Sequence, residues 1–466
     1  MEKIEKVIAG GYCIGCGACS VVNRHVTINE DGYGLYKADI SPLARSNVPF
    51  NALSEVCPFS SSRDEDELGE VFFQEADSRD PSLGFFEQIY LGYVQEGEYR
   101  SNASSGGVIT WVLAELFQQG MIDGVVHVGE AEGAGSLFTY RVSDTLEQVL
   151  GNSKTRYYPV EMSKVLQEIK DLDGVFAIVG VPCFIKAVRL LQMEDRKFKE
   201  KIKYCLSIFC GGFKSKQFSE MVASQFSIPI DKVGYIDYRK KNSEEDADKY
   251  FIEIGEKTSS GLSNVQESMA RRLYGMDWGE GLFKPKACDW CDDITGELAD
   301  LSSGDAWLPE YISDSGGSSV VVVRNKQINS MIRKAIESNR LKFKEGTVDL
   351  VVKSQDANFR HRREGLSFRI ESADKSGVWH PDKRVSSADY SISSDRKKIY
   401  ELRSRLSEQS HEKFNISKKS KGYAIFKFMG KMFPTQLYYA YKNKRTVKFL
   451  LKTVFFVATN LRRKFQ

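Results

Sequence analysis

The chain has 466 residues, of which 66 are Lys or Arg and 63 are Asp or Glu, so its formal net charge is +3. This length allows two or three domains, and a hydrophobic share of 41% with a mean hydropathy of −0.36 indicates a soluble globular protein. The N-terminus lacks the pattern of a secretory signal, which predicts a cytoplasmic location. No run approaches the roughly 18 uncharged apolar residues that cross a bilayer, and the five histidines form no metal or triad motif, which argues against histidine-based hydrolysis.

Residues 1–60 form a predicted cysteine-rich module. Cys13, Cys16 and Cys19 follow the spacing C-x2-C-x2-C in a glycine-bearing loop, and Cys57 directly precedes a proline. Three thiolates at this spacing, completed by a distant Cys-Pro, are typical of a ferredoxin-like 4Fe–4S site. The 37 residues between Cys19 and Cys57 leave room for a β-hairpin at the polar stretch NEDGYG. The alternative is a structural zinc ion on the same four thiolates.

The pattern then changes to α/β. The acidic, serine-rich start of residues 61–84 indicates a linker, and residues 85–353 form the predicted central domain. Continuous apolar runs bounded by turn residues are typical of strands buried on both faces, and they recur at 124–129, 174–180, 204–212 and 318–325. Helical patterns lie between them at 108–119 and 161–170. We therefore expect a sheet with flanking helices.

Four of the five remaining cysteines could close a second metal site. Cys183 and Cys210 fall at or just past the ends of apolar runs, where ligands collect in open α/β sheets, and Cys288 and Cys291 form another C-x2-C pair. Cys205 lies inside a predicted strand and faces the opposite side, which indicates a small buried apolar residue. A zinc ion on the C-x2-C pair, or plain buried thiols after the two strands, are the alternatives to a second cluster.

A hydroxyl- and glycine-rich turn comes directly before the helical pattern at 108–119. It consists of Ser104, Ser105, Gly106 and Gly107. Such residues at a helix N-terminus present unpaired backbone N–H groups that suit a phosphate or pyrophosphate. The alternative is an N-cap with a tight turn. No G-x-G-x-x-G fingerprint follows a strand, so a Rossmann-type NAD site is unsupported.

The chain ends in two polar segments. Residues 354–417 are charged and are predicted to form a helix-containing extension. Residues 418–466, the tail, carry thirteen Lys and Arg and no Asp or Glu, and we expect Pro434 to divide the tail in two. Around positions 444–457 lysines recur on one helical face and aliphatic side chains on another. This pattern predicts peripheral contact with an anionic membrane, with docking on the chain's own acidic body as the alternative and nucleic acid as unlikely.

Taken together, these segments resemble the beta-subunit family of coenzyme F420 hydrogenases and dehydrogenases, including its plant relative 7-hydroxymethyl chlorophyll a reductase. The resemblance runs from about residue 11 to residue 323, through NASSGGVITWVLAEL, VGVPCFIKAVRLLQ, IFCGG and CDWCDDITGELADLSSGDAW. Residues 354–410 resemble the extension of bacterial members found beside exopolysaccharide genes. The order and the combination of these motifs are more specific than any one of them.

The resemblance implies a ferredoxin-like N-terminal iron–sulfur module, a central mixed α/β flavin domain and a helical C-terminal extension. It implies FAD held by the turn at 104–107 and an inner 4Fe–4S cluster on Cys183, Cys210, Cys288 and Cys291. Where many members read Gly-Ser-Lys-Tyr, this chain reads GNSKTRY, so Lys154 is expected to reach the flavin in an altered register. Lys154 and Asp305 are the acid–base candidates, with a solvated charge or a turn residue as the alternative for each.

The implied function is that of an oxidoreductase. Electrons would pass from a ferredoxin-like donor through two 4Fe–4S clusters to FAD and a small-molecule substrate, with exopolysaccharide biosynthesis as a setting. The alternative is an electron-transfer subunit of a larger redox complex that has no substrate pocket of its own.

Overall fold

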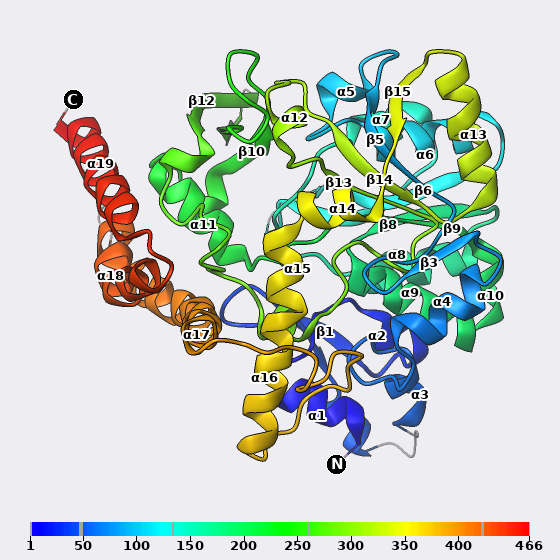
Figure 1. Cartoon of the computed structure of the whole chain (residues 1–466), viewed down its shortest axis with the longest axis horizontal. Coiled ribbons are helices and arrows are strands. Elements are labelled where there is room, and N and C mark those ends of the chain that lie inside the picture. The colour runs from blue at the N-terminus through cyan, green and yellow to red at the C-terminus, as the bar shows by residue number, and fades with distance from the viewer. Residues whose placement is uncertain (1, 46–49, 133–134, 260, 421–423, 466) are drawn as a thin grey trace.

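The computed structural model describes residues 2–45, 50–132, 135–259, 261–420 and 424–465. Parts of three predicted segments therefore lie outside the described residues: residues 1 and 46–49 of the N-terminal module, residues 133–134 and 260 of the central domain, and residues 421–423 and 466 of the tail. Figure 1 shows the N-terminal elements at the bottom, the main sheet at the upper right and the last three helices along the left side.

Short elements build the N-terminal module: α1 (Lys3–Ala9), α2 (Ala18–Val22), β1 (Thr27–Glu30), β2 (Tyr36–Asp39) and α3 (Asn51–Glu55). Strands β1 and β2 pair antiparallel, with Glu30 opposite Tyr36, which confirms the predicted hairpin. The next segment holds α4 (Glu65–Phe73), β3 (Ser78–Asp80) and β4 (Gly84–Phe86). It differs from the expected linker because Asp64 caps α4 and Glu65 is buried in an ion pair, 3.2 Å from the Nζ atom of Lys186.

The centre of the molecule is an eight-stranded sheet in the order β15-β5-β14-β13-β9-β8-β6-β7. Its strands are β5 (Gln88–Val94), β6 (Gly124–Glu130), β7 (Phe138–Ser143), β8 (Phe176–Gly180), β9 (Ile202–Ile208), β13 (Leu301–Asp305), β14 (Ser319–Val323) and β15 (Leu341–Glu345). Strands β13, β9, β8 and β6 run parallel, and the pairings outside them are antiparallel. All four apolar runs form strands of this sheet, so the predicted mixed α/β fold is confirmed.

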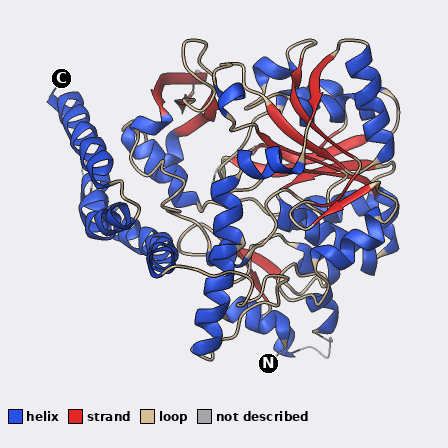
Figure 2. Cartoon of the chain, in the orientation of Figure 1, coloured by secondary structure: helices blue, strands red, loops and turns tan. Residues whose placement is uncertain are grey.

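Helices cover both faces of the main sheet (Figure 2). The helices of the central domain are α5 (Tyr99–Asn102), α6 (Val108–Gln118), α7 (Leu146–Gly151), α8 (Ser163–Asp171), α9 (Pro182–Glu194), α10 (Arg196–Lys201), α11 (Lys216–Gln225), α12 (Pro309–Ile312) and α13 (Lys326–Glu337), and α11 lies beside a second, smaller sheet. Because alternate strand residues point to opposite faces, Val125 shares a core with Trp111 of α6, whereas Val126 shares a core with α8 and α9. Cys205 is fully buried in the second core, as a small apolar residue would be.

The remaining elements are a smaller sheet and the C-terminal helices. Strands β10 (Val233–Lys240), β11 (Phe251–Thr258) and β12 (Gly261–Met269) form a three-stranded antiparallel sheet beside the main sheet. The C-terminal helices are α14 (Val348–Ser354), α15 (Asp356–Arg362), α16 (Glu364–Lys375), α17 (Ser394–Ser417), α18 (Ala424–Lys442) and α19 (Thr446–Phe465). Phe359 of α15 packs under the main sheet, and Leu366 of α16 shares a core with the N-terminal module. The C-terminal extension, residues 354–417, therefore joins the N-terminal module to the central domain (Figure 1).

The tail differs from the prediction at Pro434. Helix α18 continues through this residue, and the chain breaks instead at Lys444, whose φ is +56°. A proline removes one helical hydrogen bond, but packing of Phe428, Met429 and Met432 against the body keeps the helix intact. The predicted break at Pro434 is therefore wrong. Among the described helices, none combines the length and the apolar character that a membrane span needs.

Candidate functional site

The first cysteine site, here the outer site, gathers Cys13, Cys16, Cys19 and Cys57. Its loop lies between α1 and α2, and Gly15 and Gly17 have φ values of +70° and +91°. A Cβ atom at Gly15 would lie 2.3 Å from the carbonyl oxygen of Tyr36, so the loop packs tightly against the hairpin. Burial raises the pKa values of the Cys16, Cys19 and Cys57 thiols, and the negative charge of the other cysteines of the site adds to the increase. The four cysteines predicted from spacing are therefore neighbours.

The second cysteine site, here the inner site, gathers Cys183, Cys210, Cys288 and Cys291. Cys183 opens α9 after β8, Cys210 follows β9, and the other two cysteines stand at the short turn Lys286–Trp290 and just after it. All four line one small cavity. Burial raises the pKa of Cys183, and the charges of the other three cysteines raise it further. Within the described ranges, no three His, Cys, Asp or Glu side chains are arranged so that they could hold a metal ion, so the metal roles stay predictions.

The two cysteine sites are adjacent. Ile14 and Phe59, from the outer-site segments, line the inner cavity. The charge of Cys16 is among the groups that raise the pKa of Cys183. The rings of Tyr12 and Trp290, each next to a cysteine in the sequence, are in edge contact.

Arg362, the last residue of α15, was not identified from the sequence. It lines the inner cavity, is 2% exposed, and its Nη2 atom lies 3.8 Å from the Sγ atom of Cys210. Burial acts to lower its pKa, but the negative charge of the four inner cysteines raises it overall. The run HRR at 361–363 carries no motif, so nothing in the sequence separates this arginine from the basic residues beside it.

A large cavity of about 560 Å³ lies at the carboxyl ends of the parallel strands. Its lining includes Gly180 at the end of β8, Ile208 at the end of β9 and Asp305 at the end of β13. Cavities at this edge of a sheet, and of this size, are typical ligand sites of α/β proteins. Cys210 lines both this cavity and the small inner-site cavity.

The turn at 104–107 forms one wall of the large cavity. The Oγ atom of Ser105 donates to the carbonyl of Ser318 at 2.9 Å, and the Oγ atom of Ser104 accepts the N–H of Thr155 at 3.1 Å. Gly107, with φ +87°, caps α6, whose first residues also line the cavity. A Cβ atom at Gly106 would lie 2.7 Å from the carbonyl oxygen of Gly92. The serines therefore fix the turn, and the helix N-terminus faces the cavity.

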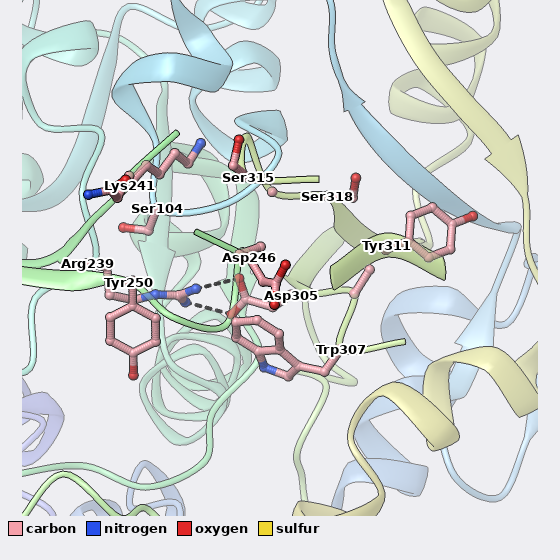
Figure 3. A pocket seen from close by; sticks show the side chains of 14 residues that line it. Ser104, Arg239, Lys241, Asp246, Tyr250, Asp305, Trp307, Tyr311, Ser315 and Ser318 are labelled. Atoms are coloured by element: carbon pink, nitrogen blue, oxygen red, sulfur yellow. Dashed lines mark hydrogen bonds and ion pairs between the residues drawn. The ribbon is translucent and has the colours of Figure 1, made fainter. Parts of the chain in front are cut away.

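Basic side chains gather beside this turn. Lys154 lies 2.9 Å from Asp237, and Arg239 makes two hydrogen bonds, of 2.6 and 2.8 Å, to Asp305 (Figure 3). Lys241 donates to the carbonyl oxygen of Ser105 at 2.7 Å. Burial and then the charges of Lys154, Arg100 and Arg239 lower the pKa of Lys241 to about 7. The arrangement favours an anion near the turn.

Lys154 and Asp305 both line the cavity, but each is held in an ion pair, so neither stands free as an acid or base. Arg239 and Lys241 were missed, although the run YRKK marks basic residues at the end of an apolar strand. The hollow in Figure 3 shares Ser104, Arg239 and Asp305 with the large cavity and is a side pocket of it.

Lys214 is a second titratable lysine in the large cavity. It is 4% exposed, donates to the carbonyl oxygen of Leu282 at 2.6 Å, and lies 4.5 Å from the ring centroid of Trp278. Burial, followed by the charge of Lys284, lowers its pKa to about 7. It could therefore exchange a proton inside the cavity near neutral pH.

Two sequence models of one protein family match the chain. Both describe the beta subunit of the coenzyme F420 hydrogenases and dehydrogenases. The model of the N-terminal part of that subunit matches residues 89–167, and the model of its C-terminal part matches residues 174–348. Together these matches cover more than half of the chain.

Individual relatives are distant. An uncharacterized protein of Methanocaldococcus jannaschii is 24% identical over 256 residues, which are 53% of this chain and 63% of the relative. The coenzyme F420-dependent sulfite reductase of the same organism is 25% identical over 356 residues, 72% of this chain and 47% of the relative. The chain thus spans less than two thirds of the length of these two relatives. The coenzyme F420 hydrogenase subunit beta of Methanothermobacter thermautotrophicus is 22% identical, over 55% of this chain and 83% of the relative.

A solved structure is also similar to the chain. It is a chain of the F420-reducing [NiFe] hydrogenase complex from Methanosarcina barkeri, with a TM-score of 0.48, 22% identity, and coverage of 66% of this chain and 98% of that chain. The two family matches overlap the predicted resemblance at residues 11–323 from residue 89 onward, and they show that the chain belongs to the coenzyme F420 hydrogenase/dehydrogenase beta-subunit family.

Proposed function

We propose that the chain is an iron–sulfur flavoprotein oxidoreductase that carries electrons from an external donor through two 4Fe–4S clusters to FAD and a small-molecule substrate. The observation that carries the proposal is the place of Cys210, which lines both the small cavity of the inner site and the large cavity. One side chain thus borders the proposed cluster site and the proposed flavin site.

The placement of the two cysteine sites supports the proposed clusters. Each site gathers four thiols: those of the inner site line one small cavity, and Cys16 and Cys19 of the outer site are each 8% exposed. Bound there, the clusters would supply one-electron transfer, and FAD would couple it to two-electron chemistry. The adjacency of the sites, through Ile14 and Phe59, supports transfer between them. Zinc on the same thiolates remains the competing interpretation.

The large cavity fits the proposed FAD. Its volume of about 560 Å³ suits a cofactor, and it extends from the turn at 104–107 to Cys210. The N-terminus of α6 and the cations Lys154, Arg239 and Lys241 would hold the phosphates. Lys214 would supply a proton to a substrate reduced in the same cavity.

A ferredoxin-like donor would meet the outer site, where Cys13 and Cys57 are partly exposed. A role in exopolysaccharide biosynthesis rests on the resemblance of the extension alone. The second candidate is an electron-transfer subunit without a substrate of its own, and the large cavity favours the complete enzyme.

Anaerobic purification followed by iron, sulfide, zinc and flavin analysis tests the proposal. We expect about eight irons and eight sulfides per chain, as two 4Fe–4S clusters require, together with one FAD. Zinc without sulfide would overturn the iron–sulfur assignment, and about four irons would remove one cluster. Bound flavin together with turnover of a small molecule by the isolated chain would separate the enzyme from the non-catalytic subunit.

We also propose that the tail holds the chain against an anionic membrane surface. One side of α18 docks on the body through Phe428 and Met432, and Phe456 of α19 is buried too. The opposite side of α19 exposes an apolar stripe at helical spacing: Val447, Leu450, Leu451, Val454 and Phe455 are 72%, 40%, 67%, 67% and 52% exposed. Because the tail also carries basic residues and no acidic ones, this apolar stripe suits an anionic lipid surface.

A further inference from the structure

The C-terminal extension buries one cation at the inner site. Arg362 lines the same small cavity as the four inner cysteines. Its Nη2 atom lies 3.8 Å from the Sγ atom of Cys210, and its Nη1 atom donates to the carbonyl oxygen of Asp293 at 3.0 Å. At 2% exposure, the guanidinium is withdrawn from the solvent that would otherwise balance its charge.

Within the described part of the chain, no carboxylate forms an ion pair with Arg362. Two other buried cations near the inner site differ in this respect, because Lys284 pairs with Asp289, and Lys383 lies 3.5 Å from Asp292. A buried charge without a partner costs several kcal/mol, so a counter-charge is required. The thiolates of the inner site are the groups placed to supply it.

In the part of the chain that the structure describes, no Lys or Arg side chain donates to the sulfur atom of an outer-site cysteine. Lys37 donates instead to the carbonyl oxygen of Cys13 at 2.6 Å and is only partly buried. Solvent screens such a charge far more than it screens one in the interior. The groups that shift the thiol pKa values of Cys16 and Cys19 are burial, the neighbouring cysteines and backbone hydrogen bonds. The two sites therefore have similar ligands but different surroundings.

We propose that Arg362 raises the reduction potential of the inner site above that of the outer site, so that electrons move inward. The inference rests on the proposed function, because it requires a cluster at each site. A fixed positive charge stabilises the more negative, reduced state of a nearby centre. One electron leaves the outer site and one electron is gained at the inner site, and no bond or proton changes place. Cys210 then borders the cavity in which the electrons are used.

Two further properties of Arg362 bear on its proposed effect on the reduction potential. The guanidinium stays protonated at every physiological pH, so the bias is permanent and does not depend on pH. Arg362 also lies beyond residue 348, where the match to the family model ends. The extension, through α15, therefore adds to the shared fold a charge that directs electron flow.

Redox titration of the anaerobically purified holoprotein, followed by electron paramagnetic resonance, tests the proposal. In Arg362→Gln the reduced-to-oxidised ratio of the inner centre at a fixed potential should fall at least tenfold, or about 59 mV for a one-electron couple. The outer centre should be unchanged. Lys37→Gln is the matched control, and it should move neither centre to this extent.

The outcomes separate the inference from the proposed function. If the unmodified protein lacks two iron–sulfur centres, the proposed function fails. If both centres are present and both potentials stay unchanged in Arg362→Gln, the inference fails alone. If Arg362→Gln loses the inner irons, Arg362→Lys is measured in its place. The shorter lysine side chain holds the positive charge farther from Cys210. A reduction potential of the inner centre below that of the unmodified protein then supports the inference, and an equal potential overturns it.

Discussion

The rings of Tyr12 and Trp290 meet edge to face, with their centroids 5.5 Å apart and their planes at 81°. Tyr12 directly precedes Cys13 of the outer site, and Trp290 stands between Cys288 and Cys291 of the inner site. The hydroxyl of Tyr12 donates to the carbonyl oxygen of Trp379, in the extension, at 3.0 Å. Three segments that are distant in sequence are thereby packed around the junction of the two cysteine sites.

Removing the Tyr12 ring should therefore loosen this junction. Tyr12 is 1% exposed, and truncation of a large buried aromatic side chain typically lowers the free energy of unfolding by about 3–5 kcal/mol. Tyr12→Phe keeps the ring and loses only the hydrogen bond to Trp379, worth about 1 kcal/mol. Anaerobic thermal unfolding should rank the unmodified protein first, Tyr12→Phe second and Tyr12→Ala a distant third. Equal losses in the two variants would show that the ring contact does not stabilise the junction.

Cysteine variants should divide the nine cysteines into two functional sets and one bystander. Cys16→Ser should lose the iron of the outer site, and Cys288→Ser the iron of the inner site, because each removes a thiolate ligand. Cys205→Ser should keep the full iron content, since Cys205 lies in β9 and is buried in the sheet core. Iron and sulfide assays on each purified variant give the answer. Iron loss in Cys205→Ser, with its fold intact by circular dichroism, would contradict the assignment.

Flavin affinity should fall as the pH rises through about 7. Burial and the neighbouring charges of Lys154, Arg100 and Arg239 lower the pKa of Lys241 to about 7, while Asp305 opposes this effect. Below that pH the lysine is a cation beside the turn at 104–107 and attracts phosphate. Above it the lysine becomes neutral, so phosphate binding must take up a proton and weakens. Fluorescence titration of flavin-depleted protein between pH 6 and pH 8.5 measures the trend.

Two substitutions control this experiment. Lys241→Arg keeps the charge at all these pH values and should give strong, nearly pH-independent binding. Lys241→Gln should bind weakly throughout. A pH dependence that persists in Lys241→Gln would assign the titration to another group, such as Lys214, whose pKa also lies at about 7.

The sequence predicted most of this architecture because local signals were strong. Double x2 cysteine spacing, apolar runs and the turn at 104–107 are short-range patterns, and the structure places them at strand ends and helix starts as expected. Arg362 could not be predicted, because its role depends on α15 packing under the sheet, which is a long-range contact. The predicted break at Pro434 was wrong for a related reason, since the tertiary packing of Phe428 and Met432 outweighed the local helix-breaking tendency of proline.

The structure also changes the interpretation of one substitution. A valine at Gly106 would place bulk beside the proposed phosphate site, but its Cβ atom would first meet the carbonyl oxygen of Gly92 at 2.7 Å and the Oγ atom of Ser319 at 2.8 Å. Gly106→Val should therefore lower stability and flavin content together. Such a result would not distinguish a blocked ligand from a distorted turn, and for this reason Lys241 is the sharper probe of the flavin site.

The tail prediction can be tested without disturbing the body. Deleting residues 418–466 would remove the fully buried Phe428 and Met432 and expose the core residues against which they pack, so a truncation after Ser417 would confuse membrane binding with misfolding. The double substitution Leu451→Asp and Val454→Asp instead changes two side chains that are each 67% exposed, and it leaves the docked face of α19 intact. Leu262→Asp, at a residue of β12 that is 51% exposed, is the matched control.

Co-sedimentation with lipid vesicles decides the role of the tail. The unmodified protein and Leu262→Asp should pellet with phosphatidylserine-rich vesicles and remain in solution with pure phosphatidylcholine, because thirteen Lys and Arg need an anionic surface. The double variant should stay in the supernatant, since carboxylates in the stripe oppose both insertion and anionic lipid. Raising the salt concentration should weaken binding of the unmodified protein. If the unmodified protein stays in the supernatant at low salt, or if the double variant pellets equally well, the exposed stripe of α19 is not a membrane-binding surface.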